Sequence, residues 1–240
     1  MIEVKNIHKS FGDKQILNDV SLSLNVGDKL AVIGQSGVGK SVLLKHLNGL
    51  LKPDRGNVFV NNIKINKVIY DQLRTIRRDM SMVFQFGALL DSLTIKENVA
   101  LAFYSNNKYD SKEIYEKVDY SLNLVGLPGI GNLMPSEISG GMKKRVGIAR
   151  AIVTNPKCIL YDEPTTGLDP INTDKINQLI GKISSSKIAS VFVTHEIKTV
   201  FNVANKVVML HDGSIIFSGS PDDLRNTKDK FIKYFVSGKK

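Results

Sequence analysis

The segment 34–41 constrains the fold of this chain more than any other part of its sequence. Its residues fit the pattern G-x-x-x-x-G-K-S/T. An apolar run typical of a strand, 30–33, precedes it, and a helical pattern, 41–50, follows it. A glycine-rich turn in that position directs backbone N–H groups toward an anion at the positive end of the helix. The sequence therefore predicts a phosphate-binding loop made of Gly34, Gln35, Ser36, Gly37, Val38, Gly39, Lys40 and Ser41.

Two residues of this loop have side chains suited to a nucleotide. We expect Lys40 to place its charge at the β and γ phosphates of ATP, and the Ser41 hydroxyl to bind Mg²⁺. The loop alone does not separate a kinase, a GTPase and a transport motor.

Bulk composition excludes several classes of protein. With 42% hydrophobic and 23% charged residues over 240 positions, the chain is expected to fold as a globular domain. It has no run of about 20 apolar residues and no signal-peptide pattern at its start, so we expect a cytosolic protein. The single cysteine, Cys158, lies in an apolar run and is expected to pack as a small hydrophobe.

The net charge of +10 is compatible with nucleotide phosphates, nucleic acid or an anionic membrane surface. The lysines are scattered or paired, as at Lys143 and Lys144, so a solvated surface is an equally good interpretation.

Strand-like and helix-like segments alternate along much of the chain. Short apolar runs recur at 30–33, 80–84, 158–161, 189–193 and 207–210. This order predicts an α/β fold with a mostly parallel sheet covered on both faces. Alternating patterns in 3–26 and 57–65 predict an additional antiparallel sheet, and Asp212 with Gly213 predicts a hairpin turn.

The segment between Phe86 and Ile138 is expected to be helical. Thr94 and Glu97 form a capping-box pattern, and Asp110 is placed to cap a second helix whose apolar face contains Ile114, Val118, Leu122 and Val125. We therefore predict one domain over 1–240, with a core formed by 1–85 and 151–240 and a helical subdomain formed by 86–150.

Two adjacent acids end the apolar run that begins at Cys158. Successive strand residues point in opposite directions, so Asp162 and Glu163 are expected to have different tasks. Asp162 is placed to hold Mg²⁺, and Glu163 to activate the attacking water as general base.

The run 137–142, which reads Glu-Ile-Ser-Gly-Gly-Met, resembles the signature sequence of ATP-binding cassette proteins. The family usually has Gln where this chain has Met142. The resemblance implies a P-loop core with an antiparallel β subdomain and an inserted helical subdomain. It also implies that Ser139, Gly140 and Gly141 contact the γ-phosphate held by a second copy of the chain.

Further positions match the family in order along the whole chain. Phe11 corresponds to the aromatic residue that stacks on adenine, although a strand aromatic is often part of a core. Gln85 corresponds to the glutamine that reaches Mg²⁺ and the attacking water. Asp169 belongs to the loop that touches the partner cassette, and His195 corresponds to the histidine that contacts the γ-phosphate.

A narrower resemblance comes from the run 84–94, from Met142 and from the run 165–170. These look like the cassettes of the lipid-asymmetry (Mla) type. That likeness implies an ATPase on the cytoplasmic face of the inner (plasma) membrane that drives phospholipid transport with an integral-membrane permease, an MCE-domain protein and a small regulatory subunit. It implies no nucleic-acid partner. An apolar run, 86–90, lies where such cassettes dock the permease.

Other functions remain open at this point. They are an importer or exporter ATPase for another cargo, a soluble ATPase of the iron–sulphur assembly type and, less compatible with the signature run, a P-loop kinase. Cargo and transport direction are not encoded in these motifs.

Overall fold

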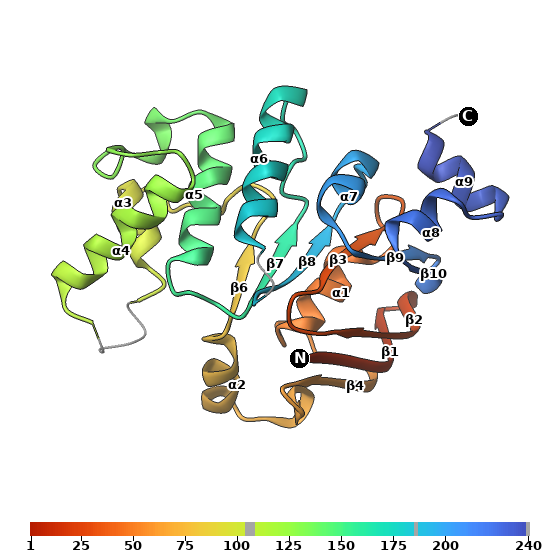
Figure 1. The fold of residues 1–240 in the computed structure, drawn as a ribbon. Coiled ribbons are helices and arrows are strands. Elements are labelled where there is room, and N and C mark those ends of the chain that lie inside the picture. The colour runs from red at the N-terminus through yellow and green to blue at the C-terminus, as the bar shows by residue number, and fades with distance from the viewer. Residues whose placement is uncertain (104–108, 185–186, 239–240) are drawn as a thin grey trace.

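The computed structural model describes residues 1–103, 109–184 and 187–238, and in this part of the chain the strands form two sheets (Figure 1). The N-terminal sheet has the strand order β2-β1-β4-β5, and all its pairings are antiparallel. This agrees with the alternating patterns in 3–26 and 57–65. Its strands are β1 (Ile2–Phe11), β2 (Lys14–Leu24), β4 (Arg55–Val60) and β5 (Ile63–Lys64).

The larger sheet has the order β10-β9-β3-β8-β7-β6. Its pairings are parallel except for the hairpin between β9 and β10, whose turn is Asp212 and Gly213. The predicted α/β class, the parallel sheet and the hairpin are therefore confirmed. The strands are β3 (Lys29–Ile33), β6 (Met80–Val83), β7 (Cys158–Asp162), β8 (Ala189–Val193), β9 (Lys206–His211) and β10 (Ser214–Gly219).

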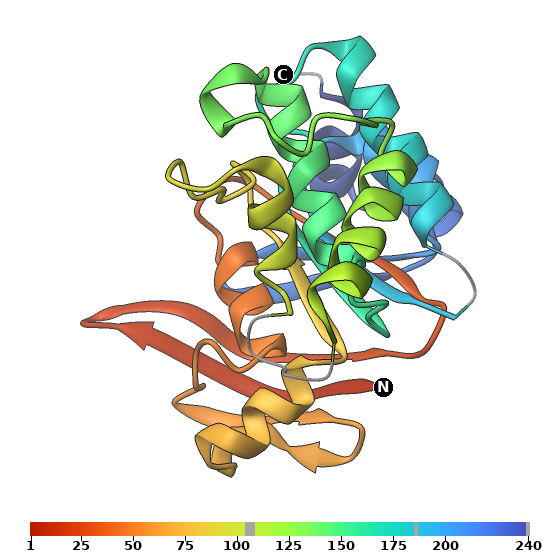
Figure 2. The same cartoon turned by 90° about the vertical axis from the view of Figure 1, so that its left-hand side faces the viewer.

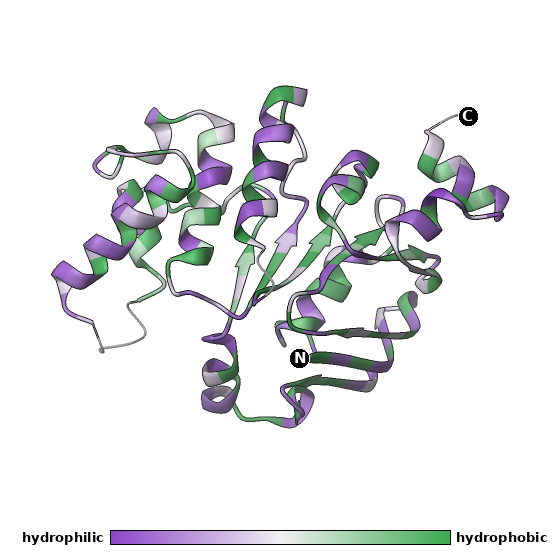
Figure 3. Ribbon diagram, viewed as in Figure 1, coloured by the Kyte–Doolittle hydropathy of each residue, from purple (hydrophilic) through white to green (hydrophobic). Residues whose placement is uncertain are grey.

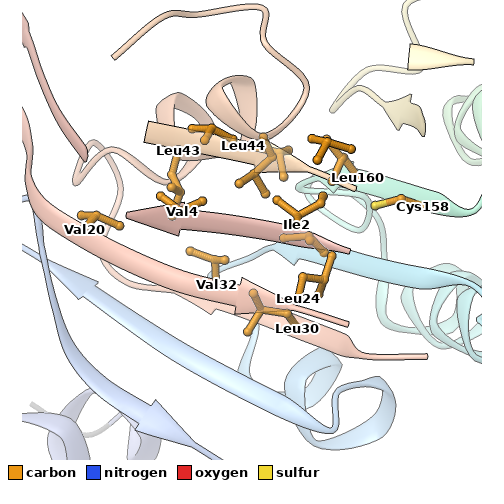
Figure 4. Close-up of a cluster of buried hydrophobic side chains, with 14 of the residues drawn as sticks. Ile2, Val4, Val20, Leu24, Leu30, Val32, Leu43, Leu44, Cys158 and Leu160 are labelled. Carbon is orange, nitrogen blue, oxygen red and sulfur yellow. The ribbon is translucent and has the colours of Figure 1, made fainter. Parts of the chain in front are cut away.

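Helix α1 (Lys40–Leu47) lies between the two sheets and contacts strands of both (Figure 1). Its Leu43 and Leu44 are buried against strand residues such as Val4 and Val32 (Figure 4). Cys158 belongs to the same cluster and is buried, as predicted. Figure 3 shows that the central strands are largely hydrophobic, whereas most helices carry a polar stripe.

Helix α1 is shorter than the sequence pattern indicates. The pattern continues to Leu50, but the helix ends at Leu47. Gly49 adopts a φ of 68°, and an added Cβ there would lie 2.9 Å from the Leu73 side chain. The left-handed turn at this glycine stops the helix.

Three helices pack together beside the β6 edge of the sheet (Figure 2). They are α3 (Ile95–Ala100), α4 (Ser111–Leu124) and α5 (Gly140–Ile152). The predicted capping box is present at Thr94 with Glu97, and Asp110 caps α4 as predicted, where it also forms a box with Glu113. The boundaries of the core at 1–85 and 151–240 and of the helical subdomain at 86–150 remain predictions.

The remaining elements connect or cover the sheets. Within the described ranges, no helix is long and apolar enough to cross a membrane. These elements are η1 (Ile65–Lys67), α2 (Tyr70–Arg77), η2 (Pro135–Glu137), α6 (Pro170–Ile183), α7 (Ile197–Val203), α8 (Pro221–Arg225) and α9 (Lys230–Ser237).

Candidate nucleotide-binding site

Four of the predicted site segments follow neighbouring parallel strands. The phosphate-binding loop follows β3, His195 follows β8, Asp162 ends β7 with Glu163 directly after it, and Gln85 follows β6. Because parallel strands end at the same edge of a sheet, the topology gathers these side chains along one edge. Gln85 lies two residues beyond β6, in a turn.

The phosphate-binding loop is fixed by its glycines. Gly34, Gly37 and Gly39 have φ values of 146°, 82° and 103°, where a side chain is strained. A Cβ on Gly34 would collide with the carbonyl oxygen of Leu210, and one on Gly39 would lie 2.9 Å from that of Ile16. The loop tip, Gln35 to Gly37, is exposed, and Val38 is half-buried. The two ends of the loop are therefore fixed by close backbone neighbours, whereas its tip is open to solvent.

Lys40 is buried at the base of this loop, with 4% of its surface exposed. Its Nζ donates hydrogen bonds to the carbonyl oxygens of Gly34, at 2.9 Å, and Gln35, at 2.8 Å. Burial lowers the pKa of Lys40, and the negative charges of Glu163 and Asp162 oppose that shift. The cation is thus already oriented into the loop before any phosphate binds.

Ser41 and Asp162 meet across the site. The Ser41 hydroxyl donates to Asp162 Oδ1 at 2.7 Å. Burial raises the pKa of Asp162; the hydrogen bond from Ser41 opposes the shift, and the neighbouring Glu163 charge adds to it. Two hard oxygen ligands lie side by side next to the loop, which is the chemistry that Mg²⁺ selects.

Glu163 is surrounded by polar groups from three other segments. Its carboxylate accepts a hydrogen bond from the Thr166 hydroxyl at 2.8 Å. Gln85 Nε2 lies 3.5 Å from Oε2, and His195 Nδ1 lies 3.4 Å from Oε1. The structure thus brings together three residues that the sequence placed in one site. A carboxylate held this way beside the phosphate loop is suited to accept a proton from water.

The two acids diverge for a different reason from the one that the sequence suggested. Asp162 is the last residue of β7, but Glu163 lies beyond the strand, with a φ of 48°. Strand alternation therefore does not separate them. The left-handed backbone at Glu163 turns its side chain toward Thr166, and such strain in a non-glycine residue is common at functional sites.

The signature run forms the start of α5. Ser139 is the N-cap, its Oγ accepts from the Met142 N–H at 3.3 Å, and both Ser139 and Gly140 are exposed. Helix α5 starts at Gly140, directly after this cap. A Cβ on Gly141 would lie 3.6 Å from Asn172. Exposed backbone amides at a helix N-terminus of this kind are suited to bind an anion.

Asp169 is near this terminus and caps α6. Its carboxylate accepts from the Asn172 N–H at 2.9 Å and from the Asn172 amide at 2.5 Å, and these bonds lower the pKa of Asp169. Met142, in place of the usual Gln, packs against the hydrophobic cluster that includes Val146. The methionine therefore supports the helix by packing.

Phe11 lies at the end of β1 and is 49% exposed, so it is not a core residue. Its ring carries Lys9 Nζ at 5.3 Å from the centroid. The adjacent strand β2 contributes Ile16, which contacts the phosphate loop at Gly39. The hairpin is thus beside the loop, and adenine stacking on Phe11 remains a prediction.

Sequence reasoning missed two residues of the site. Thr166 was not assigned a role, although its hydroxyl contacts Glu163. Lys144 was compatible with a solvated surface, but it is only 7% exposed. Its spacing of four and seven from the buried Ile148 and Ala151 is the signal that places it on the buried face of α5.

Comparisons with known proteins agree with this geometry. A family model described as ABC transporter matches residues 17–166. The chain is 38% identical to protein TRIGALACTOSYLDIACYLGLYCEROL 3, chloroplastic, of Arabidopsis thaliana, over 99% of this chain and 74% of that protein. It is also 38% identical to the probable ribonucleotide transport ATP-binding protein mkl of Mycobacterium leprae, over 100% of this chain and 69% of that protein.

Two further proteins extend the comparison. The chain is 41% identical to the methionine import ATP-binding protein MetN of Campylobacter jejuni, over 98% of this chain and 75% of that protein. Among solved structures, it is similar to the dimeric ATP-binding cassette MJ0796 in a post-hydrolysis state bound to ADP and Pi. The TM-score is 0.84 and the identity 34%, over 92% of this chain and 99% of that chain.

Proposed function

This chain belongs to the ABC transporter family, in which it is an ATP-hydrolysing subunit, and we propose that it powers phospholipid transport as part of an MCE-type system. The observation that carries the lipid assignment is the run 84–94 together with Met142. The name of the Arabidopsis relative includes a galactolipid, which supports a lipid cargo without specifying a phospholipid.

The ATP site is proposed to be completed by a second copy of the chain. Helix α5 packs on β6, which is three strand positions from β3 in the sheet. Three steps correspond to about 14 Å, so Ser139 to Gly141 are poorly placed for a phosphate in their own chain's loop. Their exposure suits a phosphate held by the partner. The dimeric cassette structures similar to this chain support that arrangement.

Within the composite site, each residue has a task that its contacts suggest. Lys40 and the loop amides bind the β and γ phosphates, Glu163 accepts the proton of the attacking water, and Gln85 and His195 hold that water and the γ-phosphate near it. Ser41 and Asp162, with Gln85, would hold Mg²⁺. When bound there, the ion neutralises charge on the β and γ phosphates.

The permease is proposed to dock on the loop after Gln85. Phe86 is 77% exposed and Leu90 is 49% exposed, whereas Leu89 packs against the hydrophobic cluster that includes Val146. Of the three large apolar side chains in the run 86–90, one is therefore packed and two lie on the surface. Exposed apolar side chains next to a catalytic glutamine suit contact with a membrane partner.

This docking loop is rigidly connected to the signature helix. Arg150 of α5 donates to the carbonyl oxygens of Gly87, at 2.6 Å, and Ala88, at 2.8 Å. Asn98 is fully buried and binds the backbone of Leu90 through both its amide nitrogen and its oxygen. The two sequence features of the lipid-type resemblance thus lie in one connected unit, so permease movement can reach α5.

Purification from gently solubilised membranes tests the proposed function. The tagged chain should co-purify with an integral-membrane permease and an MCE-domain protein, and the complex in vesicles should move a fluorescent phospholipid in the presence of ATP. The Glu163→Gln variant should form the same complex without transport. We expect the ATPase on the cytoplasmic face of the inner (plasma) membrane, and a small regulatory subunit in the complex.

The same preparation distinguishes phospholipid from methionine, the alternative cargo. The Campylobacter relative is named for methionine import, so uptake of labelled methionine is measured in parallel. ATP-dependent methionine uptake without phospholipid movement would contradict the lipid assignment and retain the transporter ATPase.

A further inference from the structure

Lys144 is a buried cation that the ATP chemistry described so far does not use. It lies on α5, two residues after the signature run, and its Nζ donates to the backbone carbonyl oxygen of Thr166 at 2.5 Å. Burial of a lysine is unfavourable unless its charge is compensated. Here burial lowers the pKa of Lys144, and the negative charges of Glu196 and Glu163 oppose that shift.

Thr166 connects this lysine to the catalytic centre. While its carbonyl accepts from Lys144, its hydroxyl donates to Glu163 Oε2 at 2.8 Å. Its N–H also donates to the Glu163 carbonyl oxygen at 3.3 Å. A continuous set of hydrogen bonds thus runs from the signature helix to the proposed general base of the same chain.

The two ends of this connection are proposed to serve different ATP sites. The N-terminus of α5 is proposed to contact the nucleotide bound by the partner, whereas Glu163 belongs to the site of its own chain. Any shift of α5 on closure over the partner's ATP therefore moves the lysine that fixes Thr166. The two composite sites of a dimer are joined through this residue.

We propose that Lys144 is a positioning residue that, through Thr166, orients Glu163 in response to closure of the signature helix on the partner's nucleotide. This inference rests on the proposed composite site and adds a coupling between its two copies. Lys144 acts on hydrolysis in its own chain's site, although it lies on the helix that serves the other site.

A linked dimer tests this assignment directly. Two full chains are joined by a cleavable linker, one half is substituted, and 8-azido-ATP is trapped with orthovanadate and Mg²⁺ before the halves are separated. Lys144→Gln should reduce trapping about tenfold in the half that carries it, since a charged hydrogen bond is lost. Loss in the opposite half, equal loss in both halves or no loss would overturn the proposal.

Control variants separate this result from failure of the composite site. Ser139→Arg should reduce trapping only in the opposite half; if it does not, the composite arrangement is wrong, whatever Lys144 does. Lys143→Gln, one residue away on α5, should leave trapping unchanged in both halves.

Thr166 variants test the same connection without altering the lysine. Thr166→Val removes the hydroxyl that donates to Glu163 and should reduce trapping in its own half. Thr166→Ser keeps a hydroxyl and should not reduce trapping. In the unlinked protein, Lys144→Gln and Thr166→Val should each lower kcat with little change in the KM for ATP. A raised KM with normal kcat, or normal trapping by Thr166→Val, would contradict the proposed path.

Discussion

We predict that the Glu163→Gly variant has a more stable fold than the Glu163→Ala variant. The φ of 48° at Glu163 places a residue with a Cβ in the left-handed region, which costs about 1–2 kcal/mol. Glycine avoids this cost but gains unfolded-state entropy worth about 0.4–1 kcal/mol. Both Glu163→Gly and Glu163→Ala lose the same hydrogen bond from Thr166. The difference should therefore be about 0–1.6 kcal/mol in favour of glycine.

Urea unfolding of the two variants, with their slopes compared, measures this difference. The matched control is Glu116, an exposed glutamate in α4. There, Glu116→Ala should be more stable than Glu116→Gly by about 0.8–1 kcal/mol, because a helix interior disfavours glycine. If alanine exceeds glycine at position 163 by a similar amount, the backbone at Glu163 is not strained and our account of its orientation is wrong.

Three further predictions concern the loop, the core and the docking segment. Gly34→Ala should abolish ATP binding measured by calorimetry and lower the melting temperature, because its Cβ collides with the Leu210 carbonyl; normal binding would refute the tight loop. Burial raises the pKa of Cys158 to about 12. Above about pH 9 the unfolded chain therefore loses the thiol proton while the folded chain keeps it. The free energy of unfolding then falls as pH rises, by up to about 1.4 kcal/mol per pH unit. Cys158→Ala should remove that component in urea titrations; an unchanged pH slope would contradict it. Phe86→Asp should weaken co-purification with the permease tenfold or more at an unchanged melting temperature. Leu89→Asp should instead lower the melting temperature, because Leu89 is packed. The reverse pattern would place Phe86 in the fold and Leu89 in the interface.

Local sequence signals predicted much of this fold. The capping box at Thr94 and the N-cap at Asp110 depend on contacts three residues apart, so the chain itself displays them. The phosphate loop is likewise visible, because its glycines and Lys40 have fixed spacing between a strand and a helix. The parallel sheet followed from the alternation of apolar runs with helical segments.

Features that depend on tertiary contacts were not visible. The convergence of Gln85, Thr166 and His195 on Glu163 joins segments far apart in the chain, and no local pattern reports it. The left-handed turn at Glu163 likewise replaces the strand alternation expected there.

Helix α5 illustrates both limits. The N-cap preference of serine, here Ser139, is the local sequence signal for its start. The burial of Lys144 required knowing which side of this helix faces Thr166. Charge alone suggested a surface residue, and helical spacing was the better guide.

Sedimentation velocity of the Glu163→Gln variant with and without Mg–ATP tests the composite ATP site most directly. Our account predicts a monomer without nucleotide and a stable dimer with it, since bound ATP is not hydrolysed. Adding Lys40→Ala should prevent dimerisation by removing ATP binding, whereas adding Ser139→Arg should prevent it while ATP still binds. A Glu163→Gln chain that stays monomeric at saturating ATP, or dimerises equally with Ser139→Arg, would contradict a site shared between two copies.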